Sequence, residues 1–247
     1  MGIILYMEGQ FMTWLTLTMA VLIACAHIFT KSMRFIRTNP RSWVLSAAGG
    51  ISVAYVFIHI MPELERNQKV LNQGLPKILN YFEYHIYLIA MIGLVLFYSL
   101  EWLVKTKAQS DGAFWVHMGS FFFYNLLIGY LLQDRMDDGI SNVLLFTVAM
   151  TLHFMVNDHS LRSSHKESYD RKGRWILAVA VLCGWALGLV RHVDKSVTAS
   201  IFAFLAGGIL LNVLKEELPK EQNSRISPFL LGVACFSILL LALASLD

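Results

Sequence analysis

Charged residues are scarce in this chain of 247 residues: they make up 15% of the sequence, while hydrophobic residues make up 56%. An ordinary soluble domain carries about 25% charged residues, so this composition excludes that class and indicates a polytopic membrane protein. No polar segment is long enough for a separate soluble domain, so we expect one all-α membrane domain over residues 1–247. The formal net charge is only +3, and no basic patch with interleaved aromatic residues is present, so no nucleic-acid partner is expected.

Cysteine is also rare. The chain has Cys25, Cys183 and Cys235, and all three fall inside apolar stretches. An odd number in apolar surroundings indicates packing residues and excludes a disulfide framework or a thiolate metal site. A nucleotide-binding motif is missing, so we expect neither an ATP-driven activity nor an organic cofactor. The first apolar stretch has neither a basic segment before it nor a small-residue cleavage site, so we expect it to be a retained helix.

Eight apolar stretches are long enough to cross a bilayer, which needs roughly 17 to 25 mostly apolar residues. They are residues 12–30, 42–62, 84–104, 113–133, 140–157, 174–192, 197–214 and 227–246. Fourteen of the 20 Lys and Arg residues follow the first, third, fifth and seventh stretches. Because basic residues prefer cytoplasmic loops, we predict a multi-pass protein of the cell membrane with both termini extracytoplasmic. The polar segment 158–174 is then the longest cytoplasmic connection.

The second and seventh stretches resemble each other. One reads AAGGISVAYVFIHIMPEL and the other LAGGILLNVLKEELPKE: a small-residue patch, about three turns of apolar helix, then a polar cluster with Pro and Glu. The loop charges predict opposite directions for the two helices, which is typical of the inverted repeats of secondary transporters. The alternative is that the small residues only allow close helix packing and that Pro-Glu is ordinary helix-end chemistry. Both interpretations stay open.

Polar residues at membrane depth form the first candidate site. Asn125 lies near the middle of the fourth stretch, and His153 lies about 20 Å along the fifth, at 1.5 Å per residue. Asn157 shares a face with His153, and Asp158 follows one step round the helix. Neutral imidazole, carboxylate and amide oxygen suit a divalent ion such as zinc, iron or manganese, with Asn125, His59 or Glu216 as a fourth ligand. For His153 alone, a hydrogen bond between helices is an equal alternative.

A second group lies at the predicted external mouth. His59 and Glu63 are one turn apart and share a face, and Glu83 and His85 begin the next stretch at the same level. Imidazole and carboxylate groups there would attract a cation before it descends. The alternative is interfacial anchoring of the helix ends, with Pro62 marking the end of the second helix.

A third group is assigned to the cytoplasmic exit. It comprises His159, His165 and Glu216. For the two histidines the alternative is that they belong to the solvated end of the fifth helix. The remaining histidines have no acid at helical spacing in the same stretch, so they are interpreted as structural or interfacial; they are His27, His117 and His192.

These motifs resemble the ZIP family of divalent metal transporters. The resemblance rests on FIHIMPEL, on FLAGGILLNVLKEELPKE and on the number of spans, and it covers most of the chain. It implies an inverted repeat of helices 1–3 and 6–8 around a central pair, 4–5, that carries the transport site. The family pattern also has departures here: Tyr124 replaces a His and Ile128 replaces an acid in the fourth helix, and Phe154 and Val156 stand where Glu and Pro are usual. A binuclear metal site is therefore not expected.

The function expected from the sequence is transport of zinc, iron or manganese by alternating access, with the metal as substrate. The protein is not expected to be an enzyme. One alternative is a non-transporting relative that acts as a sensor or partner-binding protein. Another is a membrane-embedded metal-dependent hydrolase, which would need three firm ligands and an opening to lipid. The sequence does not decide the metal, the direction or whether the protein forms a homodimer.

Overall fold

The computed structural model describes residues 2–30, 32, 42–74, 85–106, 111–136, 139–190, 193–218 and 225–245. All regular secondary structure in these ranges is helical, which confirms the all-α prediction. The helices are α1 (Gly2–Phe29), α2 (Trp43–Tyr55), α3 (Met61–Gly74), α4 (His85–Thr106), α5 (Asp111–Asp134), α6 (Ile140–Ser168), α7 (Arg174–Val190), α8 (Lys195–Asn212) and α9 (Ile226–Ala244). Three π-helical segments continue α2, α6 and α8; they are η2 (Val56–Ile60), η3 (Tyr169–Gly173) and η4 (Val213–Glu217).

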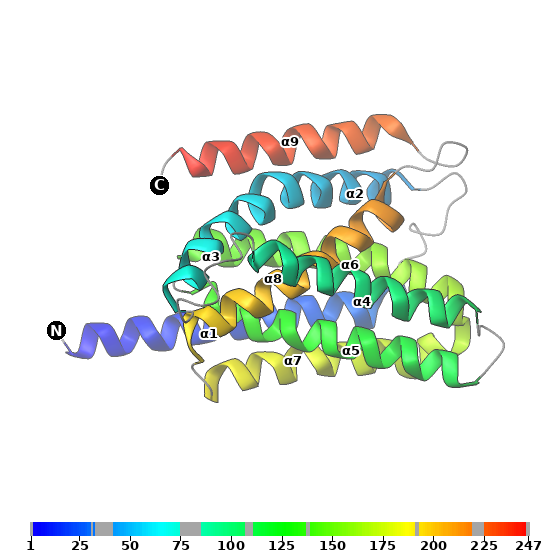
Figure 1. Cartoon of the computed structure of the whole chain (residues 1–247), viewed down its shortest axis with the longest axis horizontal. Helices are drawn as coiled ribbons and strands as arrows, with labels where there is room; N and C mark the ends of the chain where they lie inside the picture. The colour runs from blue at the N-terminus through cyan, green and yellow to red at the C-terminus, as the bar shows by residue number, and fades with distance from the viewer. Residues whose placement is uncertain are drawn as a thin grey trace.

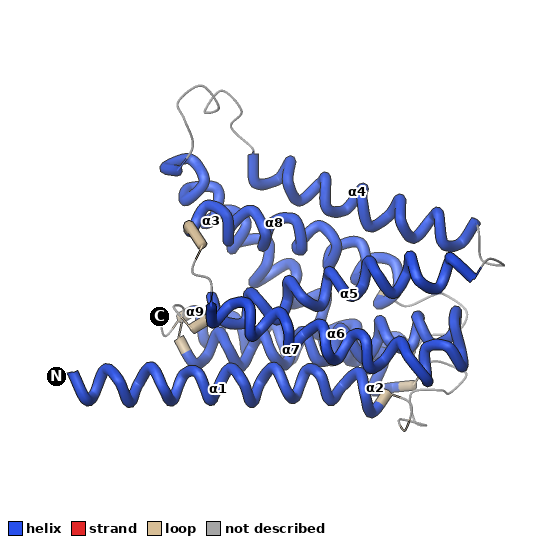
Figure 2. Tube along the Cα trace, turned by 90° about the horizontal axis from the view of Figure 1, so that it is seen from below, coloured by secondary structure: helices blue, strands red, loops and turns tan. Residues whose placement is uncertain are grey.

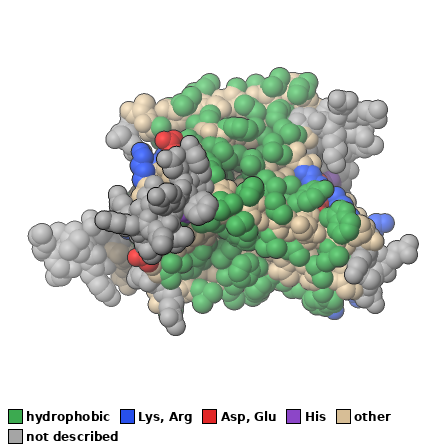
Figure 3. Space-filling view, in the orientation of Figure 1, with side chains coloured by type: hydrophobic (Ala, Val, Ile, Leu, Met, Phe, Trp, Pro, Cys, Tyr) green, Lys and Arg blue, Asp and Glu red, His purple; other side chains and the backbone are tan. Residues whose placement is uncertain are grey.

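Seven helical stretches of the described residues are long and apolar enough to cross a membrane, as the predicted multi-pass architecture requires. They are Gly9–Phe29, Trp43–Leu71, His85–Thr106, Gly112–Asp134, Ile140–Val190, Lys195–Glu217 and Ile226–Ala244. The longest stretch contains both α6 and α7, and its backbone leaves helical geometry at Lys166, with φ 38° and ψ −109°. Figure 3 shows hydrophobic side chains over the middle of one face, with the charged side chains toward its two ends. Such a surface suits a bilayer.

The long helices lie roughly along one direction (Figure 1). Most consecutive helices run in opposite directions, but α3 continues from α2 without reversing. Both views place the start of α1 and the end of α9 at the same end of the bundle (Figures 1 and 2). We call this the terminal end, and the other the opposite end. α3 ends and α8 begins at the terminal end, whereas α4 ends and α5 begins at the opposite end.

The helices pack as two groups. In the first group α1 packs on α6 and α7, and α5 packs on α7; in the second, α2 packs on α9 and α4 packs on α8. Glycines make the closest pairs possible, because a Cβ on Gly50 of α2 would overlap the carbonyl oxygen of Phe229 on α9. In the same way, a Cβ on Gly207 of α8 would overlap the carbonyl oxygen of Ala90 on α4. The small-residue patches of both predicted repeat motifs therefore allow close helix packing.

The predicted end of the second helix at Pro62 is wrong, because α3 includes Pro62 and continues to Gly74. A proline inside an α-helix removes one backbone donor and its ring clashes with the carbonyl four residues earlier. Here the preceding turn is the π segment η2, in which the N–H of Met61 donates to the carbonyl of Val56, five residues earlier. This wider turn lets the helix continue past the proline.

The predicted connection over 158–174 is largely helical: α6 continues to Ser168 with a break in helical geometry at Lys166, and η3 leads directly into α7. Hydropathy marks where the apolar part of a helix stops. It does not mark the end of the hydrogen-bonded helix, and Arg, Lys and Glu are good helix formers in water.

Candidate functional site

One polar cluster in the bundle interior joins α1, α5 and α6. The Nδ1 atom of His27 lies 3.0 and 2.9 Å from the two carboxylate oxygens of Asp158. Its Nε2 atom lies 2.8 Å from Oδ1 of Asn125. The hydroxyl of Thr30 donates to the same carboxylate at 3.0 Å. All four side chains are buried, so the cluster is a closed hydrogen-bond network that fixes three helices together.

This network uses the groups that were predicted to ligate a metal. The amide of Asn125 donates through Nδ2 to the carbonyl of Phe121 at 2.8 Å, which turns its oxygen toward His27. Both ring nitrogens of His27 therefore face side-chain oxygen atoms. The carboxylate of Asp158 is in turn engaged by His27 and Thr30. The geometry gives Asp158 and Asn125 a structural role.

A second polar cluster lies at the boundary between the two helix groups. His153 of α6 contacts Oε1 of Glu217 in η4 through Nδ1, and its Nε2 lies 3.0 Å from the hydroxyl of Tyr124 on α5. His153 and Glu217 are each 1% exposed and Tyr124 is 0% exposed. The ring of Phe97 meets the Tyr124 ring edge-on, at 5.4 Å between centroids. His153 thus points away from Asp158 and toward a carboxylate that was not among the predicted site residues.

The π segment η4 explains why Glu217, and not the predicted Glu216, occupies this position. In a regular α-helix the residue four positions after Asn212 would share its face. Each turn of a π-helix holds one more residue, so the fifth position, Glu217, comes to that face. Accordingly Asn212 and Glu217 are buried, while Glu216 is only half-buried. No hydropathy pattern indicates a π turn, although Pro219, two residues beyond η4, mirrors Pro62 beyond η2.

A polar cavity of about 400 Å³ opens at the opposite end of the bundle and leads toward His153. Asn157, one helical turn from His153, and Asn212 line its deep part. The Nδ2 atom of Asn157 has no hydrogen-bond partner among the described residues. The cavity wall also carries ionisable and hydroxyl side chains, namely Glu101, Lys105, His117, Ser160, Ser163, Ser164, His165 and Glu216. Water or a hydrated ion can therefore reach within one turn of the buried His153–Glu217 contact.

A buried ion pair lies at the terminal end. The Nη1 atom of Arg135, just after α5, lies 2.6 Å from Oε1 of Glu63 on α3. The guanidinium lies between two aromatic rings, 5.3 Å from the centroid of Phe146 and 5.1 Å from that of Phe202. Arg135 is 1% exposed. Stacking on two rings and pairing with a carboxylate offset the cost of burying this charge.

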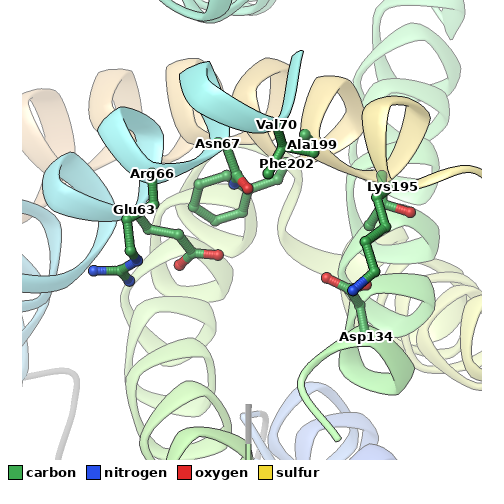
Figure 4. A pocket seen from close by; sticks show the side chains of 9 residues that line it. Glu63, Arg66, Asn67, Val70, Asp134, Lys195, Ala199 and Phe202 are labelled. Carbon is green, nitrogen blue, oxygen red and sulfur yellow. The ribbon is translucent and has the colours of Figure 1, made fainter. Parts of the chain in front are cut away.

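A smaller hollow of about 250 Å³ lies outside this ion pair. Figure 4 shows Glu63 and Asn67 from α3 facing Phe202 from α8, while the side chain of Lys195 extends toward Asp134. The ring of Phe202 thus lines this hollow on one side and stacks on Arg135 on the other. The hollow lies at the terminal end of the bundle and the cavity lies at the opposite end.

The predicted external group is found only in part. His59 and Glu63 do share a face, with Nε2 and Oε2 3.6 Å apart, and the ring of Tyr55 stacks on His59 at 4.8 Å. The carboxylate, however, is paired with Arg135. His85 is the first residue of α4 and is half-buried, and Glu83 lies outside the described residues.

Among the described residues, no three His, Cys, Asp or Glu side chains come together as a metal-binding group. Of the predicted exit residues, His165 and Glu216 line the cavity, whereas His159 lies on α6 outside its lining. His27, interpreted from the sequence as structural or interfacial, lies in the buried network with Asp158. The residues missed from the sequence are Tyr124, Arg135 and Glu217. Each is a polar or ionisable residue inside or at the end of an apolar stretch, which is the signal that could have indicated them. Comparison with models of protein families, with curated proteins and with solved structures gives no match to this chain.

Proposed function

We propose that this protein is a secondary transporter that carries a divalent metal cation, such as zinc, iron or manganese, across the cell membrane. The observation that carries the proposal is the asymmetry of the bundle. A polar cavity reaches within one turn of the buried His153–Glu217 contact from the opposite end, while Arg135 and Glu63 close the terminal end. One side open and one side closed around a central polar group is the arrangement that alternating access requires.

The proposed topology has eight spans, with both termini extracytoplasmic. The stretch Ile140–Val190 has 51 residues and would be about 77 Å long as one helix at 1.5 Å per residue, more than twice the roughly 30 Å of the hydrocarbon core. Two crossings with a turn near Lys166 fit it better. The terminal end then faces outward, because most basic residues follow the odd-numbered spans.

An inverted repeat of helices 1–3 and 6–8 is part of the proposal. The repeat motif of α2 packs on α9 through Gly50, and the motif of α8 packs on α4 through Gly207. In the proposed repeat the second span, α2, corresponds to the seventh, α8, and the third span, α4, corresponds to the eighth, α9. The two glycine contacts are then equivalent. The π segments η2 and η4 also end at the same distance before Pro62 and Pro219. This correspondence supports a repeat with reversed direction.

The proposed transport site centres on His153 and Glu217, with Asn157 and Asn212 as amide ligands from the cavity. Imidazole nitrogen with carboxylate and amide oxygens suits a divalent ion of the first transition row. The ion would enter between His153 and Glu217 in place of their direct contact. Because only the neutral imidazole binds metal, uptake should weaken as the pH falls. Asp158 and Asn125 stay in their network with His27.

A second candidate function is that of a non-transporting relative, a sensor or partner-binding protein. Its supporting observation is that His153 and Asp158 are each engaged by protein side chains. In addition, Ile128, at the position where the ZIP pattern has an acid, is fully buried in the apolar core. In this alternative the protein keeps the helical fold but has no pathway for an ion through it.

Uptake of labelled zinc, iron and manganese into proteoliposomes separates the two functions. The transporter is expected to take up at least one of the three metals. His153→Ala is expected to lower uptake per folded molecule by about tenfold or more, since it removes a direct ligand. Ser163→Ala, a change at the cavity mouth that removes no proposed ligand, serves as the matched control. If wild-type protein takes up none of the three, the non-transporting function is favoured.

A further inference from the structure

We propose that His117 and His165 form a second divalent-cation site, at the mouth of the cavity and apart from His153. His117 lies near the start of α5 and His165 near the end of α6, and both line the cavity. Nδ1 of His117 faces Nε2 of His165 at 2.8 Å. As an exit site for the cargo this inference rests on the proposed function, but metal binding at the site is measured without transport.

The geometry of the two rings is close to that of a two-histidine metal site. With zinc–nitrogen distances of about 2.0–2.1 Å and a tetrahedral angle, two ligating nitrogens lie about 3.3 Å apart. Widening the observed 2.8 Å by about half an ångström is enough to admit an ion. Neutral imidazole can place its proton on the outer nitrogen, so a change of tautomer in one ring frees both facing nitrogens.

Aromatic neighbours hold both rings in this orientation. The His165 ring packs edge-on against Phe114 at 5.3 Å, and the His117 ring packs against Phe121 at 5.2 Å. The residue after His165, Lys166, has a positive φ of 38°, a strained conformation for a side chain that is not glycine. The strained backbone at Lys166 thus directly follows His165, whose ring faces His117 of α5. Strain of this kind is common at functional sites, where the surrounding structure maintains it.

The charged groups near the pair balance one another. The cavity wall carries Glu101, Glu216 and Lys105, and Oε1 of Glu101 lies 3.1 Å from Nζ of Lys105 and also contacts Nζ of Lys215. The proposed site therefore rests on the two facing rings and not on an excess of negative charge. No third His, Cys, Asp or Glu of the described residues joins the pair as it stands. Water from the cavity would complete the coordination. Imidazole donors suit zinc and cobalt.

Equilibrium binding of cobalt and zinc to the purified full chain in detergent tests the site. Wild-type protein is expected to give a cobalt absorption spectrum that zinc abolishes, and His117→Gln and His165→Gln are each expected to weaken this binding by about tenfold or more. Glutamine keeps a polar, hydrogen-bonding side chain, so the fold is expected to be preserved. Ser164→Ala, next to His165 on the same cavity wall, is the matched control and should bind as wild type. His165→Cys should add a sulfur-to-cobalt charge-transfer band, which a purely structural role of His165 would not produce.

Unchanged cobalt affinity in both glutamine variants, with no new band in the cysteine variant, would overturn the proposal and leave a hydrogen bond only. The His153→Ala variant separates a failure of this metal site from a failure of the proposed transport function. If the pair binds cobalt in wild type and in His153→Ala but no metal is taken up by proteoliposomes, the site stands and the transport function fails. If uptake occurs but the glutamine variants bind cobalt normally, the transport function stands and this site fails.

Discussion

His153 of α6 contacts Glu217 of η4 across the boundary between the two helix groups, and both side chains are buried. The contact lies one turn beyond the deepest part of the cavity on α6, at Asn157. It is therefore the buried ionisable contact that a cation at the deep end of the cavity would meet next.

Removing only one partner of this contact should destabilise the fold strongly. His153→Ala leaves the Glu217 carboxylate buried without its imidazole, and removal of one partner of a buried pair typically costs about 3–5 kcal/mol. The double variant His153→Ala, Glu217→Gln should be less destabilised than His153→Ala, because no uncompensated carboxylate remains. Thermal or denaturant unfolding in detergent measures both. Equal destabilisation of the single and double variants would argue against a coupled pair.

Asp158→Asn should affect stability more than transport. The change weakens the hydrogen bonds with His27 and Thr30, and the unfolding free energy should fall by about 1–3 kcal/mol. Metal uptake per folded molecule should stay close to that of wild type, because Asp158 is not at the proposed transport site. Unfolding and proteoliposome uptake are measured on the same preparation. Loss of uptake with unchanged stability would instead return Asp158 to the ligand set predicted from the sequence.

Arg135→Met should destabilise the terminal end. The Glu63 carboxylate would lose its buried partner, at a cost of about 3–5 kcal/mol in unfolding free energy. Adding Glu63→Gln should recover a large part of the loss, since methionine still packs between Phe146 and Phe202. Cysteine labelling at position 198, a buried position on the wall of the terminal hollow, should be faster in Arg135→Met than in wild type if the ion pair holds the helices of this end together. No change in labelling rate would contradict that role.

Alanine substitutions at two glycines should distinguish a position in a close helix contact from an open position. A Cβ on Gly184 of α7 would overlap the carbonyl oxygen of Leu126 on α5, so Gly184→Ala should cost about 1–3 kcal/mol. Gly119 of α5 has no atom within 4 Å of such a Cβ, so Gly119→Ala should be neutral or stabilising by about 0.5–1 kcal/mol. Unfolding measurements on both variants test the α5–α7 packing. Similar effects of the two changes would contradict it.

Hydropathy was enough to find the long apolar helices, because apolar composition and length are properties of the sequence itself. It could not place the helix ends at Pro62 and at Ser168. The first depends on a π turn that accommodates the proline, and the second on backbone hydrogen bonds that continue through polar residues.

The candidate site was predicted in part. Residues on one helix, such as His59 and Glu63, were correctly placed on a shared face because spacing alone decides this. Partners on different helices were not predictable: His27 has no acid near it in sequence and meets Asp158 only because α1 packs on α6. Glu217 replaced Glu216 through the extra residue in the π turn.

Zinc, iron and manganese uptake by Glu217→Gln, compared with Glu216→Gln, tests the central claim most directly. The two variants make the same chemical change at neighbouring positions, but only Glu217 contacts His153. We predict that Glu217→Gln lowers uptake by about tenfold or more, as expected for a lost ligand, while Glu216→Gln stays within about twofold of wild type. Equal uptake by the two variants would contradict a transport site at His153 and Glu217.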